Sequence, residues 1–460
     1  MSRTLLPNGW ADGIVGDYVY LKNGFAFKSN SYVPAGEETF PIIRISDLDG
    51  QNATDVHAVH VVNGVDGFEV HKGDLLIAMS GATTGKIGIY NGVEPAYQNQ
   101  RVGNIKLHSE LYGCNRFKNH LISSLSTQII KIAYGGAQPN ISSKDIDKIE
   151  ILIPPLAEQK EIADRLDKLL AQVEATQARL ARIPDIIKHF RQSVLAAAVS
   201  GKLTEEWRTS NGLKEIQSIV LDAVIESSFY GPRFGKSEYS PDASGIPTIR
   251  TTDMKDGVIE IIENTPRVTV PADKIEQFKI NKNDLLVTRT GSIGVMALFT
   301  GNYIAIPSAY LIRFRFKASV LPKYVYYCLT SPLGQQQMGL SSTAITQPNI
   351  NAKSIRAIEI KKPCMEEQTE IVRRVEQLFA YADSIEQQAK AAKARVDKLT
   401  QAILAQAFRG ELTADWRAAN PELISGDHSA AALLARIQTE RATASGKKGK
   451  CGPRKPRATA

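Results

Sequence analysis

Two stretches of the chain carry apolar residues whose spacing alternates between three and four positions. The first contains Leu166, Leu169, Val173, Leu180, Ile187 and Val194, and the second contains Val375, Leu378, Ile385, Val396, Leu399 and Ile403. Most positions between them are charged or glutamine, so each stretch predicts a long helix with an a/d seam. Gly201 and Gly410 follow the stretches, where a glycine commonly ends a helix. Because the two seams match, we expect the helices to pack on each other as an antiparallel coiled coil.

The segments that precede these helices, 10–150 and 212–360, show a different pattern. Short runs rich in β-branched and aromatic residues alternate with glycine and asparagine turns. One helix is expected near 116–132 in the first segment and another at 322–338 in the second. The pattern predicts an α+β fold in which strands outnumber helices.

The two halves of the chain are copies of one another. The tetrapeptide Gln-Pro-Asn-Ile that begins at Gln138 recurs at Gln347, an offset of 347 − 138 = 209 residues. At this offset, 26 of the 71 positions in 138–208 are identical. Upstream the copies agree only in outline, and there Arg44 corresponds to Arg250. Each half therefore joins a divergent segment to a well-preserved helical one.

The composition is that of an ordinary globular protein of 460 residues, 43% apolar and 23% charged, a length typical of about three domains. The net charge of 56 − 48 = +8 comes mostly from the end of the chain, where six basic residues and no acidic one follow position 443. No apolar run has the length of a membrane span, and the start lacks the apolar core of a signal peptide. The 4 cysteines lie far apart, which excludes a CxxC metal pair and a disulfide framework. We expect a soluble, cytoplasmic protein.

No arrangement of residues predicts catalysis. The loop Gly81-Ala82-Thr83-Thr84-Gly85-Lys86 resembles a phosphate-binding loop, but its glycines are too close and Ile87 replaces the required Ser or Thr. A strand-to-strand turn and a turn that contacts DNA phosphate are the two interpretations left for it. Glu359-Ile360-Lys361 lacks the further acidic residue of a nuclease magnesium site. We expect no catalytic residue, no metal and no cofactor in this chain.

Polar and basic residues interleaved with aromatics are the candidates for contact with double-stranded DNA. They include Lys28, Arg44, Lys86, Gln98, Asn99 and Arg101 in the first segment, and Arg233, Lys236, Arg250, Arg289, Ser292, Arg313 and Arg315 in the second. Arg, Asn and Gln bind guanine and adenine with paired hydrogen bonds in the major groove, whereas Lys suits phosphates. Two DNA-recognition domains that bind different base sequences would show this combination of divergent segments and a preserved helical scaffold.

Several stretches in and around the helices are distinctive. They are Leu6-Pro7-Asn8-Gly9-Trp10, Ile153-Pro154-Pro155-Leu156-Ala157-Glu158-Gln159, Gly201-Lys202-Leu203-Thr204-Glu205-Glu206-Trp207-Arg208, Ala407-Phe408-Arg409-Gly410-Glu411-Leu412 and Asn420-Pro421-Glu422-Leu423-Ile424-Ser425-Gly426. Together they resemble the specificity subunit of type I restriction–modification enzymes, in its enteric branch whose prototype is the K-12 enzyme. In the divergent segments only the outline matches, so the resemblance carries over no target sequence.

The resemblance implies two α/β target-recognition domains joined by two long conserved helices in a pseudo-two-fold repeat. The expected boundaries are 1–155 for the first recognition domain, 156–208 for the central helical region, 209–362 for the second recognition domain, 363–418 for the second helical region and 419–460 for a C-terminal helix and basic tail. Each recognition domain would read one half of a split, asymmetric DNA site. The helices would set the gap between the halves.

The same resemblance implies protein partners. Two modification subunits would dock on the repeated helical regions and form an adenine-N6 methyltransferase. Two restriction subunits would add ATP-dependent translocation and cleavage. S-adenosylmethionine, ATP and Mg²⁺ would then belong to the partner subunits, and no membrane partner is expected.

Two other functions are compatible with parts of the sequence. A stand-alone DNA-binding regulator would share the repeat but would need no partner subunit. A coiled-coil assembly scaffold without DNA contact would explain the seams, although it would not explain the divergent segments.

Overall fold

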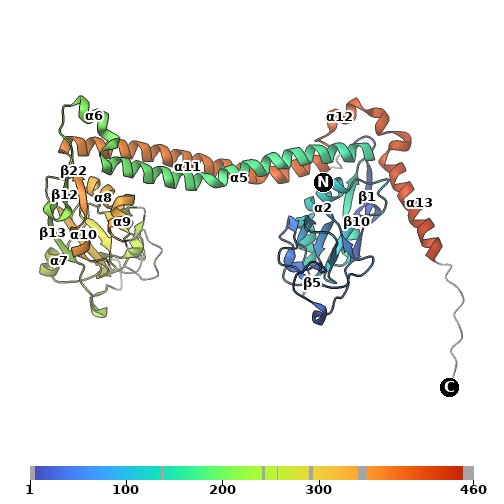
Figure 1. Cartoon of the computed structure of the whole chain (residues 1–460), viewed down its shortest axis with the longest axis horizontal. Helices are drawn as coiled ribbons and strands as arrows, with labels where there is room; N and C mark the ends of the chain where they lie inside the picture. Colours follow the sequence, from blue (N-terminus) through green and yellow to red (C-terminus); the bar gives the residue numbers. More distant parts are fainter. Residues whose placement is uncertain are drawn as a thin grey trace, which may run out of the picture. The chain divides into compact units, whose positions relative to one another are not determined.

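The computed structural model describes residues 6–135, 139–240, 244–255, 257–289, 294–339 and 350–448. It divides into two units, Met1–Ala178 with Lys393–Ala460 (unit 1) and Arg179–Ala392 (unit 2). Two long helices, α5 (Leu156–Ser200) and α11 (Met365–Phe408), each contribute residues to both units (Figure 1). The remainder of each unit is mixed strand and helix, so the α+β prediction is confirmed.

The described residues of unit 1 form three sheets. Their strand orders are β2-β10-β7-β8-β4, β5-β3-β9-β6 and β1-β11. The strands are β1 Ala11–Ile14, β2 Val19–Asn23, β3 Phe40–Ile43, β4 Asn52–Ala53, β5 Val59–Val61, β6 Glu69–Val70, β7 Leu75–Ala78, β8 Ile87–Tyr90, β9 Ala96–Gln98, β10 Val102–Leu107 and β11 Glu150–Ile153. All four residues of β7 are buried, because β7 is apolar throughout and lies between β10 and β8.

Besides α5 and α11, the α-helices in the described part of unit 1 are α1 Val15–Tyr18, α2 Asn115–Ser124, α3 Ser126–Ala133, α4 Ser143–Asp147, α12 Ala414–Ala419 and α13 Ala430–Lys448. The single helix expected near 116–132 is two helices that meet at Leu125. The core joins these elements to the long helices, since Phe117 of α2, Leu166 of α5 and Leu404 of α11 belong to one buried cluster.

Unit 2 repeats this plan. Its sheets have the orders β13-β21-β18-β19, β17-β14-β20, β12-β22 and β15-β16. The strands are β12 Gln217–Val220, β13 Ile225–Tyr230, β14 Ile246–Ile249, β15 Met254–Lys255, β16 Val258–Ile259, β17 Arg267–Val268, β18 Leu285–Thr288, β19 Met296–Leu298, β20 Ile306–Pro307, β21 Leu311–Phe316 and β22 Glu359–Lys362.

The helices of unit 2 are α6 Glu205–Ser210, α7 Ala272–Phe278, α8 Pro322–Thr330, α9 Pro332–Gln337 and α10 Ala352–Arg356. The helix expected at 322–338 breaks at Ser331, which is extended because the residue before a proline avoids helical backbone angles. Ser331 instead caps α9, where its hydroxyl accepts a hydrogen bond from the Gly334 amide.

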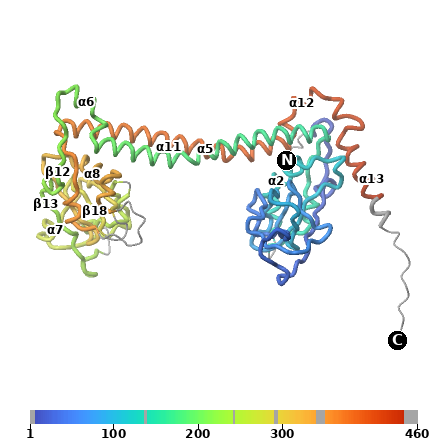
Figure 2. Tube along the Cα trace, in the orientation of Figure 1, coloured from blue at the N-terminus to red at the C-terminus, as the bar shows by residue number. Residues whose placement is uncertain are grey.

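The two long helices run antiparallel in each unit, as Figure 2 traces. In unit 1, Arg165 of α5 donates to the Leu412 carbonyl just beyond α11, and Gln177 of α5 donates to Asp397 of α11. In unit 2, Arg191 of α5 reaches Asp383 of α11. Five predicted seam residues are buried, namely Leu166, Val173, Ile187, Val194 and Val375. Six are half-buried, namely Leu169, Leu180, Leu378, Ile385, Val396 and Ile403.

The assignment of Leu399 to the seam is wrong. Its side chain is 44% exposed, whereas Leu404 and Ala407 are buried. At about 100° per residue, Leu399 lies about 140° around the helix from Leu404, so it faces away from the side on which Leu404 is buried.

Buried glutamates explain the best-preserved part of the repeat. In unit 1, Glu158 near the start of α5 accepts hydrogen bonds from Thr413 and Arg417, which follow α11. In unit 2, Glu367 near the start of α11 accepts them from Thr204 and Arg208, which follow α5. Each contact therefore ties the start of one helix to the segment after the other.

Candidate nucleic-acid interface

Two candidates for DNA contact in unit 1 lie at one edge of the four-stranded sheet. Strands β3 and β9 are parallel, with Ile43 opposite Gln98, so Arg44 and Asn99 both follow strand ends at that edge. The Asn99 amide donates to the Ile43 carbonyl (3.0 Å) and keeps the two ends together. They border a hollow of about 480 Å³, whose lining is Phe27, Ser29, Tyr32, Arg44, Ile45, Ser46, Asn99, Gln100 and Arg101.

Arg44 is oriented by the turn that follows it. It precedes the 3-10 helix η2 (Ile45–Asp47), and its amide donates to the Asp47 carboxylate (2.8 Å). Its guanidinium lies 3.6 Å from the same carboxylate and donates to the His57 carbonyl (3.3 Å). The side chain remains 34% exposed, so it is held in place and still accessible.

Arg250 occupies the corresponding position in unit 2. It follows β14, precedes the 3-10 helix η6 (Thr251–Asp253), and its amide donates to Asp253 (2.8 Å). Its guanidinium binds the Asp253 carboxylate (3.1 Å) and the Asn264 carbonyl (3.2 Å), and the side chain is 39% exposed. Each unit therefore holds an arginine at the end of a strand, with the same hydrogen bond from its amide to an aspartate three residues later.

The neighbouring strand end is also repeated, but with other side chains. Strand β20 runs parallel to β14, and the Ser308 amide donates to the Ile249 carbonyl (2.8 Å) as Asn99 does to Ile43. Each strand end continues into a turn closed by a backbone hydrogen bond, from Val102 to Asn99 (2.8 Å) and from Leu311 to Ser308 (3.0 Å). The side chains on these turns differ, because unit 1 has Asn99-Gln100-Arg101 and unit 2 has Ser308-Ala309-Tyr310.

In each unit, a glycine in a neighbouring segment packs directly against the backbone of the turn after β9 or β20. A Cβ added to Gly24 would lie 2.0 Å from the Asn99 carbonyl oxygen, and one added to Gly231 would lie 2.0 Å from that of Ser308. Only glycine fits there, so both units build this edge in the same way.

Two candidates are wrong. Gln98 is 1% exposed, because the last residue of β9 faces inward, and its side chain donates to the Lys22 carbonyl (2.9 Å). Arg313 is 6% exposed on central strand β21, where burial lowers its pKa and it lies over the Phe229 ring. Arg315 is also engaged inside the unit, by paired hydrogen bonds to Asp284 (2.9 and 2.8 Å).

The other candidates have different placements. Lys28, Lys86, Arg101, Arg233 and Lys236 are exposed. The loop before Lys86 is the β7–β8 turn, and the Thr83 hydroxyl donates to the Ile45 carbonyl (3.2 Å), which places this turn beside Arg44. Arg289 is half-buried, with its guanidinium 5.0 Å from the centre of the Tyr230 ring. Ser292 lies outside the described residues.

Aromatic residues near these edges were not among the candidates. Tyr32 lines the unit 1 hollow, where its hydroxyl accepts from the Asn99 amide group (3.3 Å). Tyr310 stands at the unit 2 position of Arg101 and is 59% exposed. Tyr310 lies three residues after the end of β20, as Arg101 does after the end of β9, and this shared offset is the signal that could have found it.

Within the described residues, no group of three or more His, Cys, Asp or Glu side chains is arranged to hold a metal ion. No helix of that part of the chain is long and apolar enough to cross a membrane.

Comparison with known proteins identifies the family. The model of the type I restriction modification DNA specificity domain matches twice, over residues 7–185 and 219–393. The chain belongs to the type I specificity subunits. It is therefore the non-catalytic, DNA-recognition component of a restriction–modification system, as the resemblance implied.

Similar specificity subunits share nearly the whole length of the chain. That of the EcoBI enzyme of Escherichia coli is 38% identical over 442 residues, 93% of this chain and 91% of the relative. That of the EcoKI enzyme of Escherichia coli strain K12 is 36% identical over 472 residues, 97% and 99% of the two chains. The crystal structure of the HsdS subunit from Thermoanaerobacter tengcongensis has the same fold, with a TM-score of 0.61, 18% identity and coverage of 89% of this chain and 99% of that one.

Proposed function

We propose that this specificity subunit reads a bipartite, asymmetric DNA site, one half with each unit, and docks two modification and two restriction subunits. One observation carries the proposal. Arg44 and Arg250 have the same half-buried, solvent-accessible position at a strand end, and the turns beside them carry different side chains. One backbone with two sets of side chains is what two half-sites of different sequence require.

The exposed groups suit base recognition in different ways. In unit 1, Arg44, Asn99 and Arg101 offer the hydrogen bonds that select guanine and adenine. In unit 2, Ala309 and Tyr310 offer apolar contact, which suits a thymine methyl group, beside Arg250. Each wrong base pair is expected to cost about 1–3 kcal/mol of binding free energy.

Phosphate contacts would orient each unit on the duplex without reading sequence. The exposed Lys28 and Lys86 of unit 1 and Arg233 and Lys236 of unit 2 suit this task. Their contribution would weaken as salt concentration rises, because bound counterions are released from DNA.

The helical regions would serve the protein partners. Their repeated sequence provides the same surface twice, which fits two copies of a modification subunit. Adenine-N6 methylation, translocation and cleavage would then occur on the partners, together with S-adenosylmethionine, ATP and Mg²⁺. The length of α5 and α11 would set the spacer between the half-sites.

An exchange of one recognition domain tests the proposal. Residues 1–155 are replaced by those of another specificity subunit, and methyladenine is located by single-molecule sequencing of the host genome. One half of the methylated sequence should change, and the other half and the spacer should not. The matched exchange of 209–362 should change only the other half. An unchanged site in both hybrids would refute the proposal.

A further inference from the structure

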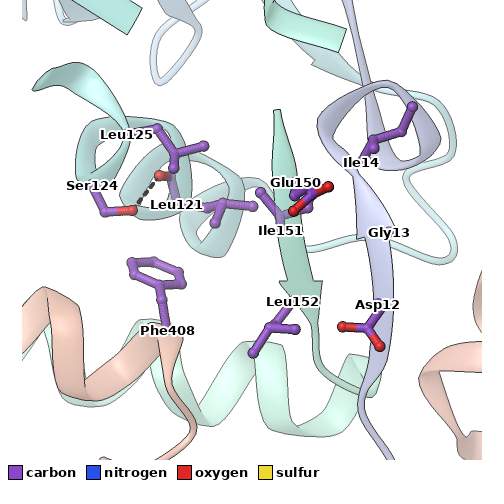
Figure 3. A pocket seen from close by; sticks show the side chains of 10 residues that line it. All are labelled: Asp12, Gly13, Ile14, Leu121, Ser124, Leu125, Glu150, Ile151, Leu152 and Phe408. Carbon is purple, nitrogen blue, oxygen red and sulfur yellow. Dashed lines mark hydrogen bonds between the residues drawn. The ribbon is translucent and has the colours of Figure 1, made fainter. Parts of the chain in front are cut away.

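Unit 1 contains a groove of about 700 Å³ whose rim is one side of strand β11 (Figure 3). Helix α2 forms the opposite wall with Leu121 and Ser124, followed by Leu125, and Phe408 at the end of α11 closes one side. Asp12 and Glu150 place carboxylates at the strand side. The groove therefore combines an apolar wall, an acidic rim and a strand edge.

The edge of β11 that turns away from β1 is unpaired. Among the described strands, β11 pairs with β1 alone. Gly13 lies opposite Ile151, and the Val15 N–H donates to the Ile149 carbonyl. This register directs the backbone N–H and C=O groups of Glu150 and Leu152 away from β1. Within the described residues, no protein group hydrogen-bonds to them.

The same edge in unit 2 also borders a hollow, of about 510 Å³, but three of its outward backbone groups are bound by side chains of the chain itself. The amide group of Gln337 accepts from the Glu359 N–H (2.8 Å) and donates to the Glu359 carbonyl (3.0 Å). The Tyr324 hydroxyl donates to the Lys361 carbonyl (2.7 Å). Phe117, like Tyr324 the third residue of its helix, has no hydroxyl to do the same in unit 1.

Unit 2 thereby shows which chemistry fits this edge. A side-chain amide resembles a peptide group, because it carries both N–H donors and a carbonyl acceptor. We propose that the open edge of β11 binds an extended segment of the modification subunit, which adds a strand beside Glu150–Leu152. The inference rests on the proposed function, since it names where one of the two expected copies is held.

The groove also specifies what the segment carries. Leu121, Leu125 and Phe408 favour an apolar side chain, and the carboxylates of Asp12 and Glu150 favour a basic one. The acidic rim repels DNA phosphates, so the occupant is a polypeptide. The end of this chain, 444–460, is basic but contains no Val, Ile, Leu, Met, Phe, Tyr or Trp, and so has nothing for the apolar wall.

Because Gln337 already fills the edge in unit 2, the two copies of the modification subunit bind unequally. The copy at unit 1 gains backbone hydrogen bonds that the copy at unit 2 does not. Native mass spectrometry of the full chain titrated with the modification subunit of the same system should resolve a tight step and a weaker step, separated by about tenfold in Kd.

Three variants test the edge. Glu150→Pro removes the outward N–H and blocks strand addition, and it leaves the β1–β11 pairing intact because that N–H is not part of it. It should weaken the tight step by about tenfold. The matched variant Glu359→Pro should change neither step. Gln337→Ala frees the N–H and C=O of Glu359 on the second edge, while Tyr324 still binds the Lys361 carbonyl, and it should strengthen the weaker step.

The outcomes separate the inference from the function on which it rests. Unchanged binding in Glu150→Pro, with DNA binding and far-ultraviolet circular dichroism like those of the wild type, overturns the open-edge proposal alone. A misfolded Glu150→Pro is replaced by Leu125→Asp, which places a charge on the apolar wall and should weaken the same step. A wild-type chain that binds no modification subunit overturns the proposed function itself.

Discussion

The Glu158 carboxylate lies 2.9 Å from the Arg417 guanidinium, although 259 residues separate them in the sequence. Glu158 is fully buried, and it also accepts hydrogen bonds from Trp10 (2.8 Å) and Thr413 (2.7 Å). Both oxygens of a buried carboxylate are thus satisfied by three side chains from two other segments of unit 1. The contact links the start of α5 to the segment that follows α11.

Removing this carboxylate should strongly destabilise unit 1. In Glu158→Ala the half-buried Arg417 loses its counter-charge and the buried Trp10 loses its acceptor, so the unfolding free energy should fall by about 3–5 kcal/mol. Urea unfolding followed by tryptophan fluorescence measures the change. The control Glu174→Ala, an exposed position of α5, should stay within about 0.5 kcal/mol of the wild type. A similar small change in both variants would contradict the role of the contact.

Lys118 should make stability depend on pH in the alkaline range. It is 1% exposed, and burial lowers its pKa from 10.5 to about 8, although its ammonium group donates to the Ile105 carbonyl (2.7 Å). Between these two values the unfolded chain binds more protons than the folded one, so the unfolding free energy rises with pH. Below about pH 8 both states are protonated and the destabilisation is complete.

Lys118→Met tests this expectation. Lys118 is the fourth residue of α2, and the fourth residue of α8 in unit 2 is the buried Val325, so this helix position accepts an apolar side chain. Relative to the wild type, the variant should be most stable near pH 7, and this advantage should shrink by on the order of 3 kcal/mol towards pH 10.5. Unfolding is measured at several pH values, with Lys131→Met at an exposed position as the control. A difference that does not vary with pH would show that Lys118 stays charged at no cost.

The two strand-end arginines should each affect one half-site. Arg44→Ala should reduce discrimination at a position in one half of the DNA site by about 1–3 kcal/mol, and Arg250→Ala should do so in the other half. Methylation of duplexes with single-base changes measures it. Arg395→Ala, an exposed position of α11, should leave both halves unchanged. Equal loss at every position from Arg44→Ala would indicate a phosphate contact instead.

The sequence predicts those features that depend on neighbours along the chain. The long helices follow from an apolar pattern repeated over many turns. The internal repeat predicts that Arg44 and Arg250 occupy corresponding positions. Gln98 and Arg313 are buried, although their polar side chains predict exposure, because the burial of a strand residue depends on which strands flank it. Polar side-chain type alone does not indicate whether the partner is solvent or, as for Arg313, Ser227 of the neighbouring strand.

The role of Glu158 could not be predicted for a related reason. The repeated Glu-Gln and Leu-Thr motifs are visible in the sequence, but their hydrogen bonds join segments more than 150 residues apart. Only the antiparallel course of α5 and α11 brings them together. The open edge of β11 depends in the same way on which side chains do not reach it.

Shortening both long helices should shorten the spacer of the DNA site. Gln177 of α5 donates to Asp397 of α11, so the segments 174–180 and 394–400 lie around one paired position, and deleting both removes matched lengths. Seven helical residues span about 10 Å, which corresponds to about three base pairs of duplex. Methyladenine sequencing should then show the same two half-sites with the smaller gap. A variant that methylates altered half-sites across the original gap would show that the helices do not set the spacing.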